Sequence, residues 1–194
     1  MDIALLEELG HCALCRVQCA GVPVKFNSDG YLDPGLHNAT QDDIEEHLVK
    51  PFTASVTRKP IFEGFVRHCS DVSAFGVDVE ELLDGSYISN KNDPGDIDLV
   101  GFADLYAIDA LPPADQVKFR ELFRGQLTKA THSCDAYFCP TVASSDPLYA
   151  KLRPQRKYWM GEFGFDRVDT PKGLIRHTVL GAKAAAGPTP TGRP

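Results

Sequence analysis

The sequence predicts a single α/β domain in which helices alternate with the strands of one sheet. A length of 194 residues fits one domain with a full core and short arms. Hydrophobic residues make up 43% and charged residues 24%, which is typical of a globular protein. Strand-like runs at residues 79–84, 96–102 and 134–139 are separated by segments with helical periodicity. Together these features favour a compact fold with both element types.

Charge and hydropathy exclude some functional classes. The formal charge of −7 argues against a protein that coats nucleic acid through a broad basic face. No run approaches the roughly 18 apolar residues that a membrane span needs. Acidic residues occupy the N-terminus, where a signal peptide would carry basic ones. We therefore expect a soluble, cytoplasmic protein with no membrane partner and with its six cysteines reduced.

Three regions follow along the chain. Residues 1–26 are expected to form an N-terminal helical arm, with the helix itself over 2–20. Residues 27–182 form the main domain. Residues 183–194 contain the run AAAGPTPTGRP, whose small residues and prolines predict a disordered tail.

The arm carries three cysteines at close spacing, Cys12, Cys15 and Cys19. They are zinc-ligand types, but one C-x-x-C without a second pair is a weak signal. A packing face of small residues is the alternative.

Three helices are predicted inside the domain. The first begins after an N-cap at Thr40 and carries two acidic residues in its first turn. The second opens at Pro60, and the third follows Pro113. Their inward residues are expected to be Ile44 and Leu48 in the first, Ile61, Phe65, Cys69 and Val72 in the second, and Phe119, Leu122, Phe123 and Leu127 in the third.

The predicted strands surround a polar turn. A strand over residues 79–84 leads into Gly85-Ser86, and residues 87–93 form a short helix or loop before the strand at 96–102. A third strand is expected at 134–139. Near the end of the domain, the run FGFDRVDTPKGLIRHTV reads as a hairpin of two strands about a DTPKG turn.

The two aspartates at the start of the second strand suggest a metal site. Asp96 and Asp98 are two residues apart, so both carboxylates point to one face of a strand. Two like charges side by side are costly unless a cation lies between them, and oxygen ligands favour magnesium or manganese. A solvent-facing strand that carries two aspartates without a task is the alternative.

The turn before them suggests a phosphate ligand. Gly85 lets the backbone approach a phosphate closely, and the hydroxyl of Ser86 can donate to it. Amides that open a helix would add a partial positive charge. A triphosphate held there would lie beside a metal bound by the aspartates, and positioning with charge neutralisation supplies most of the catalysis in phosphoryl transfer.

A third carboxylate commonly completes a two-metal site. Asp135 opens the third strand and would lie beside the pair, where it could bind metal or accept a proton from the attacking hydroxyl. An aspartate at a strand start without a role is the alternative.

A basic segment offers further contacts. Lys151, Arg153, Arg156 and Lys157 could contact a triphosphate tail or an RNA acceptor. A solvated helix face explains the same residues equally well.

These motifs resemble a known superfamily. Gly85-Ser86, then nine intervening residues, then Asp96-Ile97-Asp98 and a later strand with Asp135, are similar to the nucleotidyltransferase fold of DNA polymerase beta and of the small bacterial minimal nucleotidyltransferases. The longer pattern GYLDPGLHNAT, LLDGSYISNKNDPGDIDLV, YWMGEFGFDR and PKGLI resembles an uncharacterised bacterial family of nucleotidyltransferase-like proteins over residues 29–178.

The resemblance implies a fold, a cofactor and a set of site residues. It implies a short mixed sheet flanked by helices, with the C-terminal hairpin added. The implied site has Asp96, Asp98 and Asp135 as catalytic and metal residues for Mg²⁺ (or Mn²⁺). Nucleotide contacts are expected from Gly85, Ser86, Lys91, Lys151 and Arg156, with Lys91 in place of the arginine that often follows Gly-Ser in the family.

Two functions follow. The first is transfer of a nucleoside monophosphate from a nucleoside triphosphate, with ATP as the first expectation, to a hydroxyl of a protein, an RNA or a small molecule. The second is a non-catalytic protein of the same fold that binds a partner, as an antitoxin does.

Overall fold

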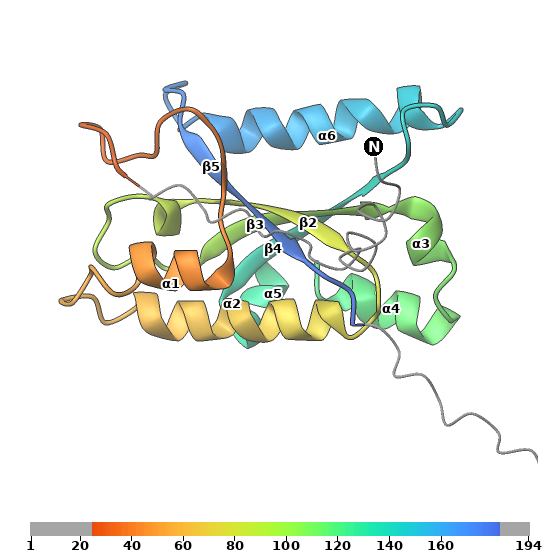
Figure 1. The fold of residues 1–194 in the computed structure, drawn as a ribbon, viewed down its shortest axis with the longest axis horizontal. Coiled ribbons are helices and arrows are strands. Elements are labelled where there is room, and N and C mark those ends of the chain that lie inside the picture. The colour runs from red at the N-terminus through yellow and green to blue at the C-terminus, as the bar shows by residue number, and fades with distance from the viewer. Residues whose placement is uncertain (1–24, 183–194) are drawn as a thin grey trace, which may run out of the picture.

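The structure, a computed structural model, describes residues 25–182, which fold into one mixed sheet covered by helices (Figure 1). The predicted arm helix, the cysteines at 12, 15 and 19, and the predicted tail lie outside the described residues. The strands are β1 Gly35–Asn38, β2 Val79–Asp84, β3 Ile97–Asp104, β4 Cys134–Thr141 and β5 Gly173–Val179. The helices are α1 Gln41–Leu48, α2 Arg58–Ser73, α3 Leu105–Asp109, α4 Pro113–Glu121, α5 Gln126–His132 and α6 Tyr149–Gly164.

The five strands lie in the order β1-β5-β2-β3-β4. The central strands β2 and β3 are antiparallel, with Asp84 opposite Asp98. The pair β3 and β4 is parallel, with Asp98 opposite Asp135. The sheet is therefore mixed, and the predicted mixed α/β fold class is confirmed at this level. The register places aspartates of three adjacent strands in one row.

Each face of the sheet is covered differently. Helix α6 lies along one face, and α1, α2 and α5 lie on the other (Figure 1). Side chains alternate between the faces of a strand, so Leu82 and Val100 pack with Phe163 of α6, while Leu83 and Leu99 join the larger core on the α2 side. The row consists of Asp84, Asp98 and Asp135. Their side chains point to the same face of the sheet as Leu82 and Val100, which is the face that α6 covers.

Local sequence explains the first two helices. Thr40 and Asp43 form a reciprocal capping box at the start of α1, which confirms the predicted N-cap. Helix α2 begins at Arg58, two residues before Pro60, and buries the predicted stripe of Ile61, Phe65, Cys69 and Val72. An amphipathic helix of this kind is held by the face that it buries.

Two predicted elements are corrected. The segment after Pro113 forms two helices, because Gly125 adopts a left-handed backbone angle, φ +60°, and separates α4 from α5. Leu127 is therefore exposed and is not part of an inner face with Phe119. None of the helices in the described part of the chain is long and apolar enough to cross a membrane.

The prediction of a C-terminal hairpin is also wrong. The run that begins at Phe163 continues α6 to Gly164, and a single antiparallel bridge joins Phe165 to Pro171. The second run is a true strand, β5, but it pairs with β1 and β2 in the middle of the sheet. Long-range pairing, which local patterns do not encode, determines its partners.

Candidate functional site

The site is built at one end of the three strands β2, β3 and β4. Asp84 is the last residue of β2, Asp98 the second of β3 and Asp135 the second of β4. Asp96 precedes β3 by one residue. Single ligand oxygens of Asp96, Asp98 and Asp135 all lie within 4.8 Å of one another. The structure therefore brings the three predicted metal ligands together.

The backbone at Gly85 approaches this cluster closely. Gly85 has φ +80°, and a Cβ added there would collide with Oδ2 of Asp98 and lie 2.9 Å from its Cγ. The residue must be glycine both for its backbone angle and for the space that Asp98 occupies. Ser86 follows in a single 3-10 turn, Ser86–Ile88. The short helix or loop expected after Gly85-Ser86 is thus a single 3-10 turn followed by a loop.

The carboxylates repel one another in a partly buried setting. Burial, followed by the charges of Asp96, Asp84 and Asp135, raises the pKa of Asp98 to about 6. Asp135 is buried, and its Oδ1 has no hydrogen-bond partner among the described residues. A buried carboxylate oxygen without a partner costs free energy that a bound cation would remove. The oxygen donors, their spacing and this unpartnered atom fit a hard divalent ion.

Two lysines that the sequence analysis did not assign border the cluster. Lys172 donates to Oδ1 of Asp84 at 2.6 Å, and both side chains are about one-tenth exposed. Lys129 of α5 forms an ion pair with Asp96. Burial raises the pKa of Asp84, and Lys172 acts in the opposite direction. Asp84 was missed as a member of the cluster, although its position directly before Gly85 was a usable signal.

One loop and one arginine side chain hold the turn in place. The carbonyl of Gly30 accepts from the backbone of Asn90, and the carbonyl of Leu32 accepts from that of Gly173. The loop that contains GYLDPG is therefore tied to both the Gly85 turn and the start of β5. Arg58 fills the space beneath the turn and donates to carbonyls of Tyr87, Ser89 and Lys91.

The predicted basic contacts lie elsewhere. Arg156 pairs with Glu80 and lies over the ring of Phe102, 4.3 Å from its centroid. Glu80 is four residues from Asp84, about 13 Å along the strand. Lys151 is exposed in the first turn of α6, at the same distant end. Lys91 has an exposed side chain in the loop after Gly85. The structure does not bring Lys151 and Arg156 to the aspartates.

Comparison with known proteins yields one result. A model of DUF6932, described as a family of unknown function, matches residues 24–178. No curated protein and no solved structure matches the chain.

Proposed function

The chain belongs to DUF6932, a family of unknown function, and we propose that it is a metal-dependent nucleotidyltransferase of the nucleotidyltransferase fold. It would transfer a nucleoside monophosphate from a nucleoside triphosphate to a hydroxyl group on a protein, an RNA or a small molecule. The observation that carries the proposal is the convergence of Asp96, Asp98 and Asp135 in front of the glycine turn, with a buried oxygen of Asp135 that has no partner in residues 25–182.

Each residue has a defined task in this reaction. Asp96, Asp98 and Asp135 would hold Mg²⁺ or Mn²⁺, which neutralises phosphate charge and polarises the α-phosphate when bound. Gly85 leaves room for the triphosphate to approach the backbone, and Ser86 donates a hydrogen bond to it. Lys172, beside Asp84, lies close enough to Asp98 to act on its charge and would attract the anionic substrate.

The transfer needs no reactant other than the nucleoside triphosphate and the acceptor hydroxyl. The acceptor hydroxyl attacks the α-phosphorus in line with the bond to the bridging oxygen of the β-phosphate. That bond breaks, and pyrophosphate leaves with its electron pair. Asp135 would take the hydroxyl proton on the carboxylate oxygen that does not bind the metal. Most of the rate enhancement would come from positioning and charge neutralisation.

Labelled triphosphates test the proposal. Purified full-length protein is incubated with Mg²⁺, cell lysate and each nucleoside triphosphate, labelled at either the α- or the γ-phosphate. Transfer of the α-label, lost in Asp98→Asn and retained in Asp109→Asn, is expected; Asp109 is an exposed aspartate at the end of α3. Transfer of only the γ-label would mean another reaction. Absence of Mg²⁺-dependent nucleotide binding would refute the proposal.

One observation favours the alternative of a non-catalytic, antitoxin-like binding protein. Lys129 and Lys172 already neutralise Asp96 and Asp84 through ion pairs within the chain. Because lysines already neutralise Asp96 and Asp84, these two of the four aspartates do not need a metal ion for that purpose. A stable co-purifying partner, together with no α-label transfer by the wild-type protein, would select this function.

A further inference from the structure

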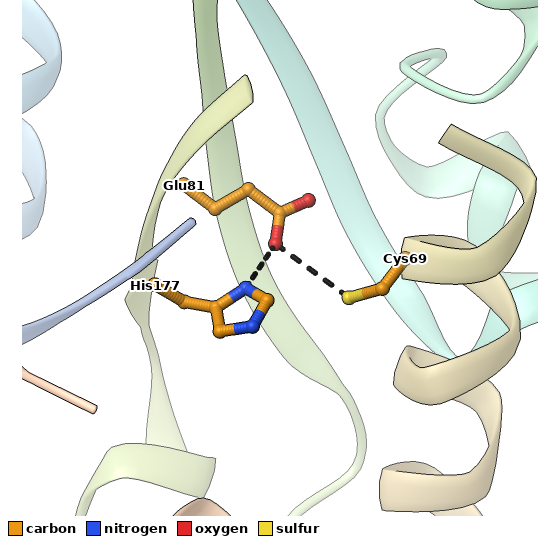
Figure 2. A group of neighbouring side chains, drawn as sticks. All are labelled: Cys69, Glu81 and His177. Atoms are coloured by element: carbon orange, nitrogen blue, oxygen red, sulfur yellow. Dashed lines mark hydrogen bonds and ion pairs between the residues drawn. The ribbon is translucent and has the colours of Figure 1, made fainter. Parts of the chain in front are cut away.

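A second group of metal-ligand side chains lies on the other face of the sheet. Cys69 comes from α2, Glu81 from β2 and His177 from β5, and the three side chains point toward one another (Figure 2). One ligand atom from each lies within 4.8 Å of the other two. Glu81 and Asp84 are three residues apart on one strand, so they face opposite sides. The group is therefore separate from the aspartate cluster.

The spacing suits a tetrahedral ion. Nδ1 of His177 lies 3.1 Å from Oε2 of Glu81, and Sγ of Cys69 lies 3.8 Å from the same oxygen. Zinc binds sulfur at about 2.3 Å and nitrogen or oxygen at about 2.0–2.2 Å, so tetrahedral geometry places its ligand atoms roughly 3.3–3.7 Å apart. The nitrogen–oxygen separation of 3.1 Å is slightly shorter than this range, and the sulfur–oxygen separation of 3.8 Å is slightly longer. Little movement would be needed to bind zinc.

His68 supplies an independent indication of a missing cation. Its Nε2 donates to the carbonyl of Leu122 at 2.9 Å, so in the neutral ring Nδ1 carries a lone pair. That atom faces Oε1 of Glu81 at 3.5 Å. Both atoms are buried and have no hydrogen-bond partner among the described residues. Two acceptors that face each other in a dry core require a cation, either a proton on His68 or a metal ion.

Burial and access distinguish this group from a surface cluster. His68 and Glu81 are fully buried, and Cys69 is only 3% exposed. Cys69 and His177 nevertheless line a surface hollow of about 450 Å³, bordered by Thr40 and Gln41 at the start of α1. The hollow gives an ion a route to the group, which a buried metal site requires.

We propose that Cys69, Glu81 and His177 form a zinc-binding site, with the fourth position open to the hollow that Cys69 and His177 line. A thiolate with one imidazole and one carboxylate suits zinc and not magnesium, which prefers oxygen ligands alone. His68, which faces the other oxygen of Glu81, would orient the carboxylate for metal binding. Binding releases the thiol proton of Cys69, and the ion joins α2, β2 and β5. This proposal does not depend on the nucleotidyltransferase activity.

Zinc analysis of the full-length protein tests the site, with Cys12, Cys15 and Cys19 replaced by serine so that the N-terminal thiols cannot contribute. We expect one equivalent of zinc in this variant in excess magnesium. Cys69→Ser in the same background should lower zinc affinity at least about a hundredfold, because even loss of a partner that orients a ligand costs about 10- to 100-fold. The matched control is Cys139→Ser, a buried thiol on the α6 face.

Cobalt substitution removes the risk that Cys69→Ser fails to fold. In a variant whose only cysteine is Cys69, bound Co²⁺ should show a thiolate-to-cobalt charge-transfer band, and added zinc should abolish it. Absence of both the band and bound zinc in folded protein would overturn the proposal. The four residues would then form a buried polar network without a metal.

Discussion

Asp98 is the residue on which the aspartate cluster depends, and its charge destabilises the fold. Folding raises its pKa from 3.8 to about 6, first through burial and then through the three neighbouring aspartates. The folded state therefore favours the protonated form. The cost of ionising Asp98 is absent below pH about 4 and complete above pH about 6.

Asp98→Asn should consequently stabilise the protein in the absence of metal. At about pH 8 with a chelator, we expect a gain on the order of 1–2 kcal/mol, after allowance for solvent screening of a partly exposed group. Thermal unfolding measures it, and the gain should vanish toward pH 4. Added Mg²⁺ should raise the melting temperature of the wild type and not of the variant. A less stable variant at pH 8 would contradict this account.

Gly85 offers a second test at this scale. In Gly85→Ala the new methyl group would collide with Asp98, and an alanine is strained at φ +80°. We expect a loss of about 1–3 kcal/mol in unfolding free energy, together with loss of Mg²⁺-dependent nucleotide binding. Gly95→Ala is the matched control in the same loop, because no atom of the described part of the chain lies within 4 Å of an added Cβ there. Denaturant titration and equilibrium binding distinguish the two variants.

Single residues of the site were predictable only in part. Asp96, Asp98 and Gly85 belong to a short local motif, so their proximity follows from spacing along the chain. The sequence by itself assigns no role to Lys172, yet its side chain is about nine-tenths buried against Asp84, 88 residues away. A pair so distant in sequence leaves no local pattern.

At the scale of elements, the loop after Gly85 is shaped by the start of α2. The guanidinium of Arg58 is almost fully buried and makes five hydrogen bonds to carbonyls of Leu48, Tyr87, Ser89 and Lys91. It also lies over the ring of Phe52, 3.6 Å from the centroid. One side chain thus holds α1, α2 and the loop together.

Arg58→Lys should separate these elements. Lysine has three donors in place of five and cannot form the planar fork, so several buried carbonyls lose their partners. We expect a loss on the order of 3 kcal/mol in unfolding free energy, measured by denaturant titration. Arg67→Lys, an exposed arginine of the same helix, should change stability by less than about 0.5 kcal/mol. Equal effects of the two changes would refute the role of Arg58.

Helix boundaries show where element prediction fails. The capping box at Thr40 and the stripe on α2 are local signals, and both elements form as predicted. The break at Gly125 was missed because glycine inside an apolar pattern is tolerated in many helices. Here its N–H bonds to the carbonyl of Ala136, which adds the loop to β4. The break between α4 and α5 therefore depends on a contact with β4, which the local sequence does not show.

On the scale of the whole molecule, the sheet separates two polar clusters. The α6 face carries the aspartates, and the α2 face carries the buried group of Glu81, Cys69, His68 and His177. Burial alone would raise the pKa of Glu81, but the nearby rings of His177 and His68 outweigh burial and lower it to about 2. Glu81 is therefore ionised in the centre of the core.

Glu81→Gln should weaken the whole fold. It removes the buried carboxylate that the rings of His68 and His177 face, and a buried polar group left without its partner costs about 1–3 kcal/mol, more where the group is charged. Glu80→Gln is the neighbouring control: its half-buried pair with Arg156 should contribute about 1 kcal/mol or less. The unfolding free energies of the two variants are to be compared at neutral pH. Equal losses would show that Glu81 has no special role in the core.

By itself, the sequence determined the three core strands, the helices around residues 41–48 and 58–73, and the aspartate and glycine motif. These features depend on periodicity and turn chemistry within a few residues, which any local segment carries. Tertiary structure decided that β5 lies between β1 and β2, that Lys172 pairs with Asp84, and that Cys69, Glu81 and His177 meet beneath the sheet. Such contacts join distant segments, as where Gly35 pairs with Gly173, 138 residues later. Only the packing of the complete chain selects among the pairings that the local patterns allow.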